Sequence, residues 1–353
     1  MRSSRLLGLM AVLLFLGGGI VGGGGALVLG PNTMAYDAPR SVYLPQDGSL
    51  DTAIDSLDRA GILASPRTFR LVAEAAGWGA QIKSGHYRIA SHSSNYEMLD
   101  KLRRGLQDPV RVRFLPGRRA DALAETMGQA LERDADAFRT AFRDTSLARD
   151  LGTTPDRLFG YMLPNTYEFY WQTPAETVVR RVKRAFDRFY ERELAASADS
   201  AGLTKREVVT LASIVEKEAL VDAEKPTVAG VYTNRLDRGW PLQADPTVQY
   251  ALVDTGEDRV TRVLHEHLEI DHPYNTYQIQ GLPPGPIATP SRSSLRAAAR
   301  PERHEYFYFA ADGTGGHTFS RTLQEHNRAV QKYHRLLDER EEAESTPETM
   351  GGT

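Results

Sequence analysis

The sequence contains no cysteine, and its charges almost cancel, with 43 basic and 46 acidic residues among 353. Without cysteine, the chain cannot form disulfides, thiolate zinc sites or a cysteine nucleophile. A near-neutral chain without a basic block gives no sign of a nucleic-acid partner. Apolar residues make up 41% of the sequence. The length is therefore enough for two or three domains with a sizeable core.

Motifs of several enzyme classes are also missing. The chain has no HExxH helix for zinc and no GxSxG nucleophile elbow. His265, His267 and His272 lie close together in the chain, but three histidines in a polar loop are more often exposed to solvent than bound to a metal. The only glycine-rich run, 17–25, lies inside an apolar segment, so it is not a phosphate loop. We therefore expect no metal and no cofactor, and carboxylates remain as the candidates for catalysis.

The N-terminal segment carries a long run without charge, residues 6–30. As a helix, a run of this length can cross ~30 Å of hydrocarbon. Arg2 and Arg5 precede it, which favours a cytoplasmic N-terminus. The pattern predicts a cytoplasmic stub (1–5), a transmembrane anchor (6–30) and a remainder outside the inner membrane. A cleaved signal peptide is the alternative, but the alanines that follow are three apart, which fits a cleavage site poorly.

The segment 41–109 has the pattern of a small α+β unit. Strand patterns at 41–44 and 85–89 enclose two helical patterns, and a third helix ends at Gly105. Units with this order of elements often bind glycans. A spacer between the membrane and the next domain is an equally good interpretation.

The remainder predicts a larger α+β domain over 110–342, followed by a disordered polar tail over 343–353. We expect a strand at Val110–Leu115, a buried strand at Tyr306–Ala310 that leads into a hairpin, and these helices: Asp121–Phe142, Thr177–Ala196, Lys205–Ala219, Thr227–Leu236, Thr247–Leu252, Ser291–Ala299 and Thr322–Glu342. Aromatic residues are dense between Phe159 and Trp171. They could line a sugar-binding groove or belong to the core, and the sequence leaves both interpretations open.

The helix predicted at Lys205–Ala219 carries two glutamates in different positions. Its apolar residues recur at helical spacing: Val208, Leu211, Ile214 and Val215. Glu218 falls on that apolar face, whereas Glu216 falls away from it, where an ordinary solvated residue would lie. Burial favours the protonated form of a carboxyl group, and protonation of a leaving oxygen requires that form. A glutamate at the edge of the face, paired with a basic residue, is the alternative.

The number of carboxylates separates two kinds of glycan cleavage. A hydrolytic glycosidase usually needs two, and Asp245 and Glu168 are the possible partners of Glu218. Lytic cleavage of a muramic acid glycan needs only one. The 6-hydroxyl of the sugar attacks its own anomeric carbon, so a 1,6-anhydro sugar forms and no water is consumed.

Several motifs occur in a characteristic order: Leu211-Ala-Ser-Ile-Val-Glu-Lys-Glu218, Val231-Tyr-Thr-Asn-Arg-Leu236, Leu242-Gln-Ala-Asp-Pro-Thr-Val248, Tyr274-Asn-Thr-Tyr277, Gly281-Leu-Pro-Pro-Gly-Pro-Ile-Ala-Thr-Pro290 and Gly315-Gly-His-Thr-Phe319. Together with the N-terminal anchor, they resemble the endolytic murein transglycosylase family (MltG, YceG-like). The resemblance extends from about Val42 to about Leu337. The chain departs from the family pattern at Phe159, where an acidic residue is usual, and at Leu163-Pro-Asn165, where the family has Phe-Pro-Asp.

The resemblance implies a fold and a function. It implies a LysM-like subdomain over 41–109 and a catalytic domain over 110–342, on a single-pass inner-membrane protein whose catalytic domain is periplasmic. It implies a lytic endotransglycosylase that cuts the MurNAc–GlcNAc bond within nascent peptidoglycan strands, leaves 1,6-anhydro-MurNAc ends and terminates glycan elongation. The expected partners are glycan strands, the inner membrane and peptidoglycan synthases. A non-catalytic glycan-binding scaffold of the synthesis machinery is the alternative.

The resemblance also implies site residues. Glu218, the second glutamate of the Glu-Lys-Glu motif, is implied as the catalytic acid, in agreement with the helical spacing. The candidate substrate-binding residues come from the later motifs: Asn234, Gln243, Asp245, Asn275 and Tyr277. For each of these, a hydrogen bond that fixes a loop is the alternative role.

Overall fold

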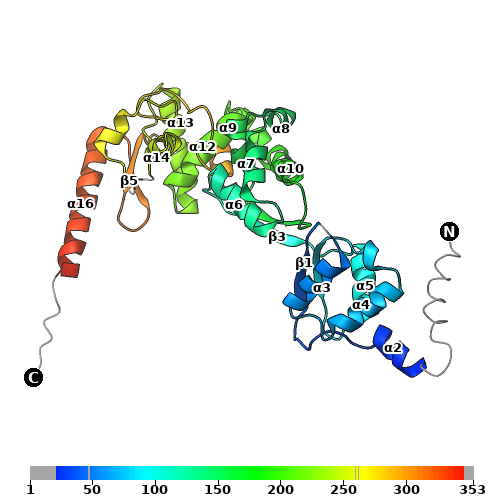
Figure 1. The fold of residues 1–353 in the computed structure, drawn as a ribbon. Coiled ribbons are helices and arrows are strands. Elements are labelled where there is room, and N and C mark those ends of the chain that lie inside the picture. The colour runs from blue at the N-terminus through cyan, green and yellow to red at the C-terminus, as the bar shows by residue number, and fades with distance from the viewer. Residues whose placement is uncertain (1–20, 47, 259, 261, 346–353) are drawn as a thin grey trace, which may run out of the picture. The chain divides into compact units, whose positions relative to one another are not determined.

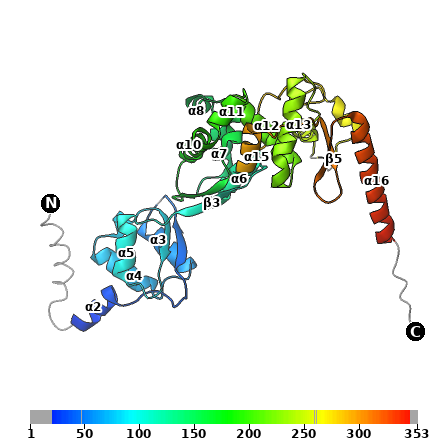
Figure 2. The same ribbon diagram turned by 180° about the vertical axis from the view of Figure 1, so that it is seen from behind.

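The computed structural model describes residues 21–46, 48–258, 260 and 262–345, and the chain divides into two units (Figures 1 and 2). The first unit contains the described residues through Val112, together with the returning segments Gln129–Asp134 and Tyr167–Pro174. The second unit contains the other described residues from Arg113 onward. Both helices and strands occur, so the predicted α+β class is confirmed.

The first unit contains the strand–helix–helix–strand order that the sequence predicts. Strand β1 pairs with β2 in antiparallel register, with Val42 opposite Tyr87. The elements in chain order are α2 (Val21–Leu29), β1 (Arg40–Leu44), α3 (Leu50–Arg59), α4 (Pro66–Ala75), the short 3₁₀ helix η1 (Gly79–Gln81), β2 (Gly85–Ile89) and α5 (Asn95–Arg104). The LysM-like character of this unit stays a prediction.

Local chemistry sets the helix ends in this unit. The side chain of Ser49 accepts a hydrogen bond from the backbone of Thr52 and caps α3, as predicted. Ser94 and Glu97 form a reciprocal capping box at the start of α5. Gly105 ends α5 in the left-handed conformation (φ 66°), which glycine adopts without strain. The unit contains a buried apolar cluster formed by the helices and the β1–β2 pair, whose largest members are Tyr87, Phe69, Leu44, Leu57, Ile62, Ile89, Met98 and Leu99.

The second unit is mainly helical. Strands β3 (Val110–Phe114) and β4 (Asn165–Phe169) pair with each other, and the boundary between the units falls within both strands. Strands β5 (Tyr308–Ala311) and β6 (His317–Ser320) form an antiparallel hairpin that packs on α16. The helices are α6 (Ala120–Ala130), α7 (Ala135–Arg143), α8 (Thr145–Asp150), α9 (Pro155–Leu158), α10 (Ala175–Glu193), α11 (Ala195–Ser200), α12 (Lys205–Glu218), α13 (Lys225–Asp237), α14 (Asp245–Asp254), α15 (Arg292–Ala299) and α16 (Leu323–Ser345), with 3₁₀ turns η2 (Phe159–Tyr161), η3 (Asp222–Glu224) and η4 (His265–Glu269).

Two predicted elements are wrong in detail. The single helix expected over 121–142 is two helices, because the backbone N–H of Glu132 donates to the carbonyl of Trp171 (2.9 Å) instead of continuing the helical ladder. The strand expected to be buried at 306–310 begins at Tyr308 and is half-buried, because it pairs only with β6.

The aromatic segment between Phe159 and Trp171 belongs mostly to the core. Tyr161, Tyr167 and Phe169 are buried, and part of the segment forms β4, which the sequence analysis missed. Only Tyr170 is well exposed, at 59%. The structure therefore favours core packing over a sugar groove for most of these rings.

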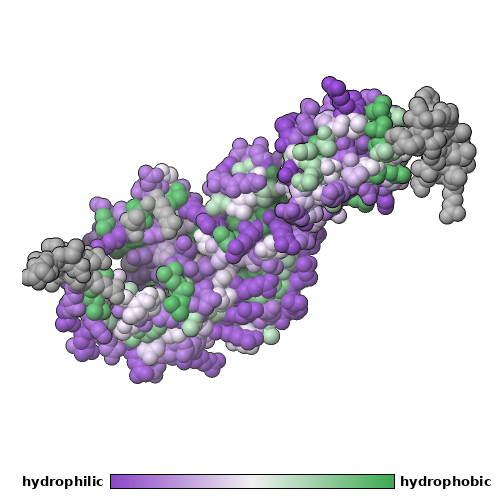
Figure 3. Space-filling model, turned by 90° about the horizontal axis from the view of Figure 1, so that it is seen from below, coloured by the Kyte–Doolittle hydropathy of each residue, from purple (hydrophilic) through white to green (hydrophobic). Residues whose placement is uncertain are grey.

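The predicted stub at 1–5 lies outside the described residues, as does most of the predicted anchor. Among the residues that the structure describes, no helix is both long and apolar enough to cross a membrane. Helix α16 extends to Ser345 and so includes the first three residues of the predicted tail, and 346–353 lie outside the described residues. On the face shown in Figure 3, hydrophilic side chains dominate and hydrophobic ones form small separate patches.

Candidate active site

The middle part of helix α12 is buried on all sides. A capping box of Thr204 and Glu207 begins the helix, and Glu218 is its last residue. All eight residues from Val208 to Val215 are buried, because α13, α14 and α15 all contact the helix (Figure 1). The helix therefore has no solvated face in this part.

Glu216 is buried, and the prediction of an ordinary solvated residue is wrong. Its side chain is only 11% exposed. The carboxylate oxygen Oε2 accepts hydrogen bonds from the backbone N–H of Ser291 (3.0 Å), the hydroxyl of Ser294 (2.6 Å) and the ammonium group of Lys225 (3.3 Å). These donors satisfy its negative charge inside the protein.

Glu218 has the environment that a proton donor needs. Burial raises the pKa of its carboxyl group from 4.5 to about 7. The hydroxyl of Tyr232 donates to Oε1 (2.8 Å) and moderates the rise, while the negative charge of Asp245 adds to it and the cation of Arg235 opposes it. The position at the end of α12 also disfavours a negative charge, because a helix C-terminus carries partial negative charge. The predicted upward shift of this pKa is confirmed.

Tyr232 lies in α13, and its side chain is fully buried. Burial raises the pKa of its hydroxyl well above 10, and the neighbouring Glu218 raises it further. The hydroxyl therefore stays protonated and remains a hydrogen-bond donor to the carboxyl group. The sequence pattern predicted Tyr232 only as an apolar position of a helix, and its place in the motif Val231-Tyr-Thr-Asn-Arg-Leu236 was the available signal.

Asp245 and Tyr277 lie beside Glu218 in the same electrostatic environment. The hydroxyl of Tyr277 donates to Oδ1 of Asp245 (2.6 Å), and burial raises the pKa of this tyrosine. Asp245 is exposed at the first turn of α14, where the helix N-terminus favours its negative charge. Two of the five predicted binding residues are thus brought together with the predicted acid.

Arg235 is a second residue that the sequence analysis did not select. Its guanidinium group is buried and donates to the carbonyls of Phe307 and Leu242 (both 2.7 Å) and to the side chain of Gln243 (3.3 Å). Gln243 is exposed and adopts φ 51°, a left-handed conformation that is uncommon outside glycine. The backbone carbonyl of Thr276 accepts from its N–H (3.0 Å), so contacts on both sides hold this conformation.

Asn275 is fully buried within its loop. Its side-chain amide donates to the carbonyls of Leu268 (2.9 Å) and Ile270 (2.8 Å), and its side-chain oxygen accepts from the N–H of Tyr277 (3.0 Å). These bonds favour the alternative role of fixing the loop, in which the residue orients Tyr277.

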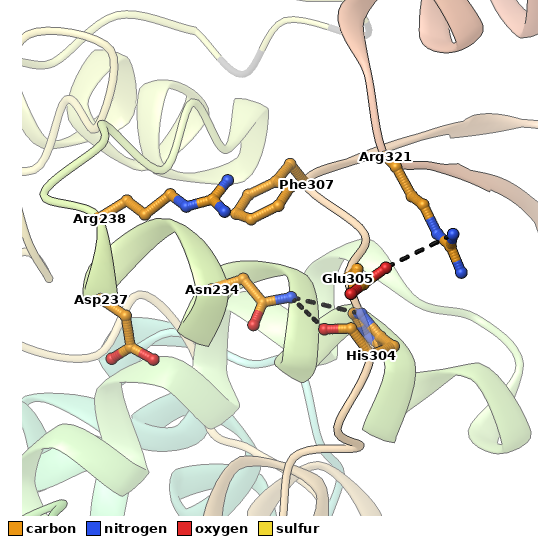
Figure 4. A pocket seen from close by; sticks show the side chains of 7 residues that line it. All are labelled: Asn234, Asp237, Arg238, His304, Glu305, Phe307 and Arg321. Carbon is orange, nitrogen blue, oxygen red and sulfur yellow. Dashed lines mark hydrogen bonds and ion pairs between the residues drawn. The ribbon is translucent and has the colours of Figure 1, made fainter.

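Asn234 lines a pocket of about 540 Å³ (Figure 4). Its amide donates to the carbonyls of His304 and Tyr306 (both 2.9 Å), so it too holds a loop. The guanidinium group of Arg238 lies 3.8 Å from the centroid of the Phe307 ring at the same pocket. Glu218 does not line this pocket, whose other residues are Asp237, Glu305 and Arg321.

Within the described ranges, no cluster of three or more histidine or acidic side chains could hold a metal ion. His267 and His272 instead accept backbone hydrogen bonds from Leu264 and Tyr274. Glu168, the other possible second carboxylate, is exposed in the first unit and pairs with Arg111 (3.2 Å). Of these two candidate carboxylates, Asp245 is therefore the one whose charge acts on Glu218.

Comparisons with known proteins agree with the motifs. The model of the YceG-like family matches residues 42–332. The chain is 40% identical over 177 residues to the endolytic murein transglycosylase of Bacillus subtilis (strain 168), which covers 50% of this chain and 48% of that protein. It is 28% identical over 326 residues to the endolytic murein transglycosylase of Streptococcus pneumoniae (strain D39), which covers 83% of this chain and 58% of that protein. The chain thus spans less than two thirds of the length of these relatives.

A solved structure is also similar. The crystal structure of a yceG-like protein from Listeria monocytogenes matches with a TM-score of 0.57 and 27% identity, covering 83% of this chain and 99% of that one.

Replacing Glu218 should make the protein more stable at high pH. Because the folded pKa of about 7 exceeds the ordinary value of 4.5, the folded state binds the proton more tightly. The contribution of Glu218 to the free energy of unfolding is therefore highest below pH 4.5, falls as the pH rises to 7 and stays low above that. Glu218→Gln removes this loss of stability at high pH, which is at most about 3 kcal/mol.

Urea unfolding should show the Glu218→Gln variant more stable than the parent at pH 8 and equal to it at pH 4. Glu207→Gln, in the same helix, is the control and should bring no gain, because hydrogen bonds lower the pKa of Glu207. Equal stability of Glu218→Gln and parent at pH 8 would contradict the raised pKa.

Removing the Tyr232 hydroxyl should raise the pKa of Glu218 above 7, because its hydrogen bond stabilises the ionised carboxylate. The carboxyl resonances of ¹³C-labelled glutamate, followed by NMR from pH 4 to 9, would measure this in Tyr232→Phe. Tyr190→Phe is the matched control, because Tyr190 stacks on Phe186 in α10. An unchanged or lower pKa in Tyr232→Phe would show that the bond does not act on Glu218.

Proposed function

The chain belongs to the YceG-like family, and on that premise we propose that it is a lytic endotransglycosylase that cleaves the MurNAc–GlcNAc bond within nascent peptidoglycan strands. The observation that carries the proposal is the carboxyl group of Glu218, which burial keeps protonated near neutral pH. The names of the Bacillus and Streptococcus relatives, both endolytic murein transglycosylases, support the same substrate and reaction.

In the proposed reaction, Glu218 acts first as an acid and then as a base. Its carboxyl proton passes to the glycosidic oxygen as the bond between that oxygen and the anomeric carbon of MurNAc breaks. The 6-hydroxyl of the same MurNAc then attacks the anomeric carbon, and the Glu218 carboxylate takes the hydroxyl proton. The carboxyl group is thereby regenerated, and the product strand ends in 1,6-anhydro-MurNAc. A pKa near 7 suits both steps, because neither protonation state is strongly favoured.

Neighbouring residues have supporting roles in this proposal. Tyr232 holds the carboxyl group in place and stabilises its charged form between the two steps. Asp245 and Tyr277, which lie beside the acid, and Gln243, which is exposed and contacts Arg235, are assigned to substrate contact. Asn234 and Asn275 are assigned to the loops that carry these contacts.

A hydrolase is the second candidate, because Asp245 is close enough to raise the pKa of Glu218. In that case Asp245 would activate a water molecule, and the products would carry ordinary reducing ends.

Mass spectrometry of digested, uncrosslinked glycan strands distinguishes the candidates. We expect products that end in 1,6-anhydro-MurNAc, and Glu218→Gln should lower the rate by about 100-fold or more, since loss of a general acid typically costs 10²–10⁴-fold. Glu168→Gln, an exposed carboxylate of the first unit, is the control and should keep the parental rate. Reducing ends would identify a hydrolase. Glycan binding without cleavage would identify a scaffold.

We further propose that residues 6–30 anchor the chain in the inner membrane, with the catalytic unit in the periplasm beside the peptidoglycan synthases and a LysM-like subdomain at 41–109. The support is the charge-free run that follows Arg2 and Arg5. In cell fractionation, the chain should stay with membranes after a carbonate wash, and a variant lacking 1–30, exported by a separate signal peptide, should be soluble. A shortened, soluble product from the intact chain would show that the segment is a cleaved signal instead.

A further inference from the structure

A polar network, buried at Lys225 and open to solvent at Asp222, lies at the junction of α12, α13 and α15. It consists of one ammonium group, two carboxylates and three hydroxyls: Lys225, Glu216, Asp222, Ser291, Ser293 and Ser294. We refer to these six residues as the Glu216 network. The reaction proposed above uses none of them.

Glu216 connects α12 to the start of α15. Its Oε2 accepts from the backbone N–H and the hydroxyl of Ser291, which is the N-cap of α15, and from the hydroxyl of Ser294 (2.6 Å) in the first turn. A helix N-terminus favours a negative charge, so this end of α15 and the carboxylate stabilise each other.

Lys225 connects the same carboxylate to the start of α13. Its side chain is only 5% exposed, and its ammonium group donates to Glu216 (3.3 Å), Ser291 (3.2 Å) and Ser293 (3.1 Å). It also pairs with Asp222 (2.7 Å), which is 71% exposed. Since a buried cation without a carboxylate partner is costly, Lys225 fixes the position of α13 relative to Glu216.

Helices α12 and α13 are therefore joined by two polar contacts. One is the ion pair of Lys225 with Glu216, and the other is the hydrogen bond from Tyr232 to Glu218. Lys225 and Tyr232 are seven residues apart, which is about two helical turns, so they lie on the same face of α13. On α12, only Lys217 separates the two glutamates.

We propose that Glu216 is a positioning residue, which holds the end of α12 so that the Glu218 carboxyl group stays buried against the Tyr232 hydroxyl. This inference rests on the proposed function and deepens it, because Glu216 would act on the reaction only through Glu218. The contact between a carboxyl group and its donor depends on a few tenths of an ångström, and a small displacement of a catalytic group can lower a rate by about 100-fold.

Glu216→Gln is the direct variant, since it keeps the shape of the side chain. The amide has no negative charge for Lys225, and its NH₂ group is a donor placed among donors. Asp222 still pairs with Lys225, so we expect the fold to survive. The charged and titratable groups around Glu218 itself stay in place: Tyr232 and Arg235 from α13, Asp245 from α14, and Tyr277.

The test combines two measurements on the full chain. In Glu216→Gln, kcat on glycan strands should fall about tenfold or more with KM within about threefold, because the substrate contacts are untouched. By ¹³C NMR, the pKa of Glu218 should fall from about 7 toward 4.5, because the carboxyl group is no longer held in its buried position. Glu207→Gln, in the capping box at the other end of α12, is the matched control and should change neither kcat nor this pKa. Glu216→Asp, which keeps the charge on a shorter side chain, should recover part of kcat.

The results for Glu216→Gln distinguish a residue that positions Glu218 from one that only stabilises the fold. A fall in kcat with an unchanged Glu218 pKa, accompanied by a lower melting temperature, would overturn the proposal in favour of a structural role. Parental values of both kcat and pKa would overturn it as well.

In the double variant with Tyr232→Phe, the two effects on the pKa of Glu218 should not be additive, because both act on one contact. If the parent protein cleaves no glycan, the proposed function fails, whereas the NMR titration still tests whether Glu216 positions Glu218.

Discussion

The hydrogen bond between the hydroxyl of the buried Tyr232 and the carboxyl group of the partly buried Glu218 is the interaction on which the site depends. Burial alone would push the carboxyl pKa upward, and the hydrogen bond pulls it back. The donor itself cannot ionise near neutral pH, because the same burial raises its own pKa. The balance leaves an acid that can both give and take a proton near pH 7.

The two glutamates of α12 show how the surroundings decide the chemistry of a residue type. The Glu216 carboxylate accepts hydrogen bonds from an ammonium group, two hydroxyls and a backbone N–H. Glu218, two residues later, lies near a carboxylate and at a helix C-terminus, and the single hydrogen bond from Tyr232 and the cation of Arg235 only partly offset the effect of burial on its negative charge. The contacts of Glu216 stabilise a helix junction. The surroundings of Glu218 lower the stability of the fold but keep a reactive proton on the carboxyl group.

The sequence predicted the first unit well, because its signals are local. Ser49 and Gly105 set helix ends through contacts a few residues away, and these signals were readable in the sequence. Glu218 was selected for a reason that is only partly right. Its apolar spacing was real, but α12 is buried on all sides, so spacing could not show that Glu216 is buried too. That burial comes from α15, which lies some 75 residues further along the chain.

Other predictions were wrong or incomplete because they too depend on contacts between residues far apart in the sequence. The break between α6 and α7 depends on a bond to Trp171, far away in sequence. Tyr232 and Arg235 looked like ordinary members of a helix, since their importance follows from contacts with Glu218 of α12 and with the carbonyl of Phe307. Asn275 looked like a surface residue of a binding loop, whereas its side chain forms hydrogen bonds inside that loop.

The dependence of the glycan cleavage rate on pH, measured at saturating substrate with the parent protein, tests the central claim most directly. If a single buried carboxyl group must carry its proton into the reaction, kcat should fall as the pH rises through about 7. A rate that stays constant up to pH 9, or that is already lost above pH 5, would contradict the account.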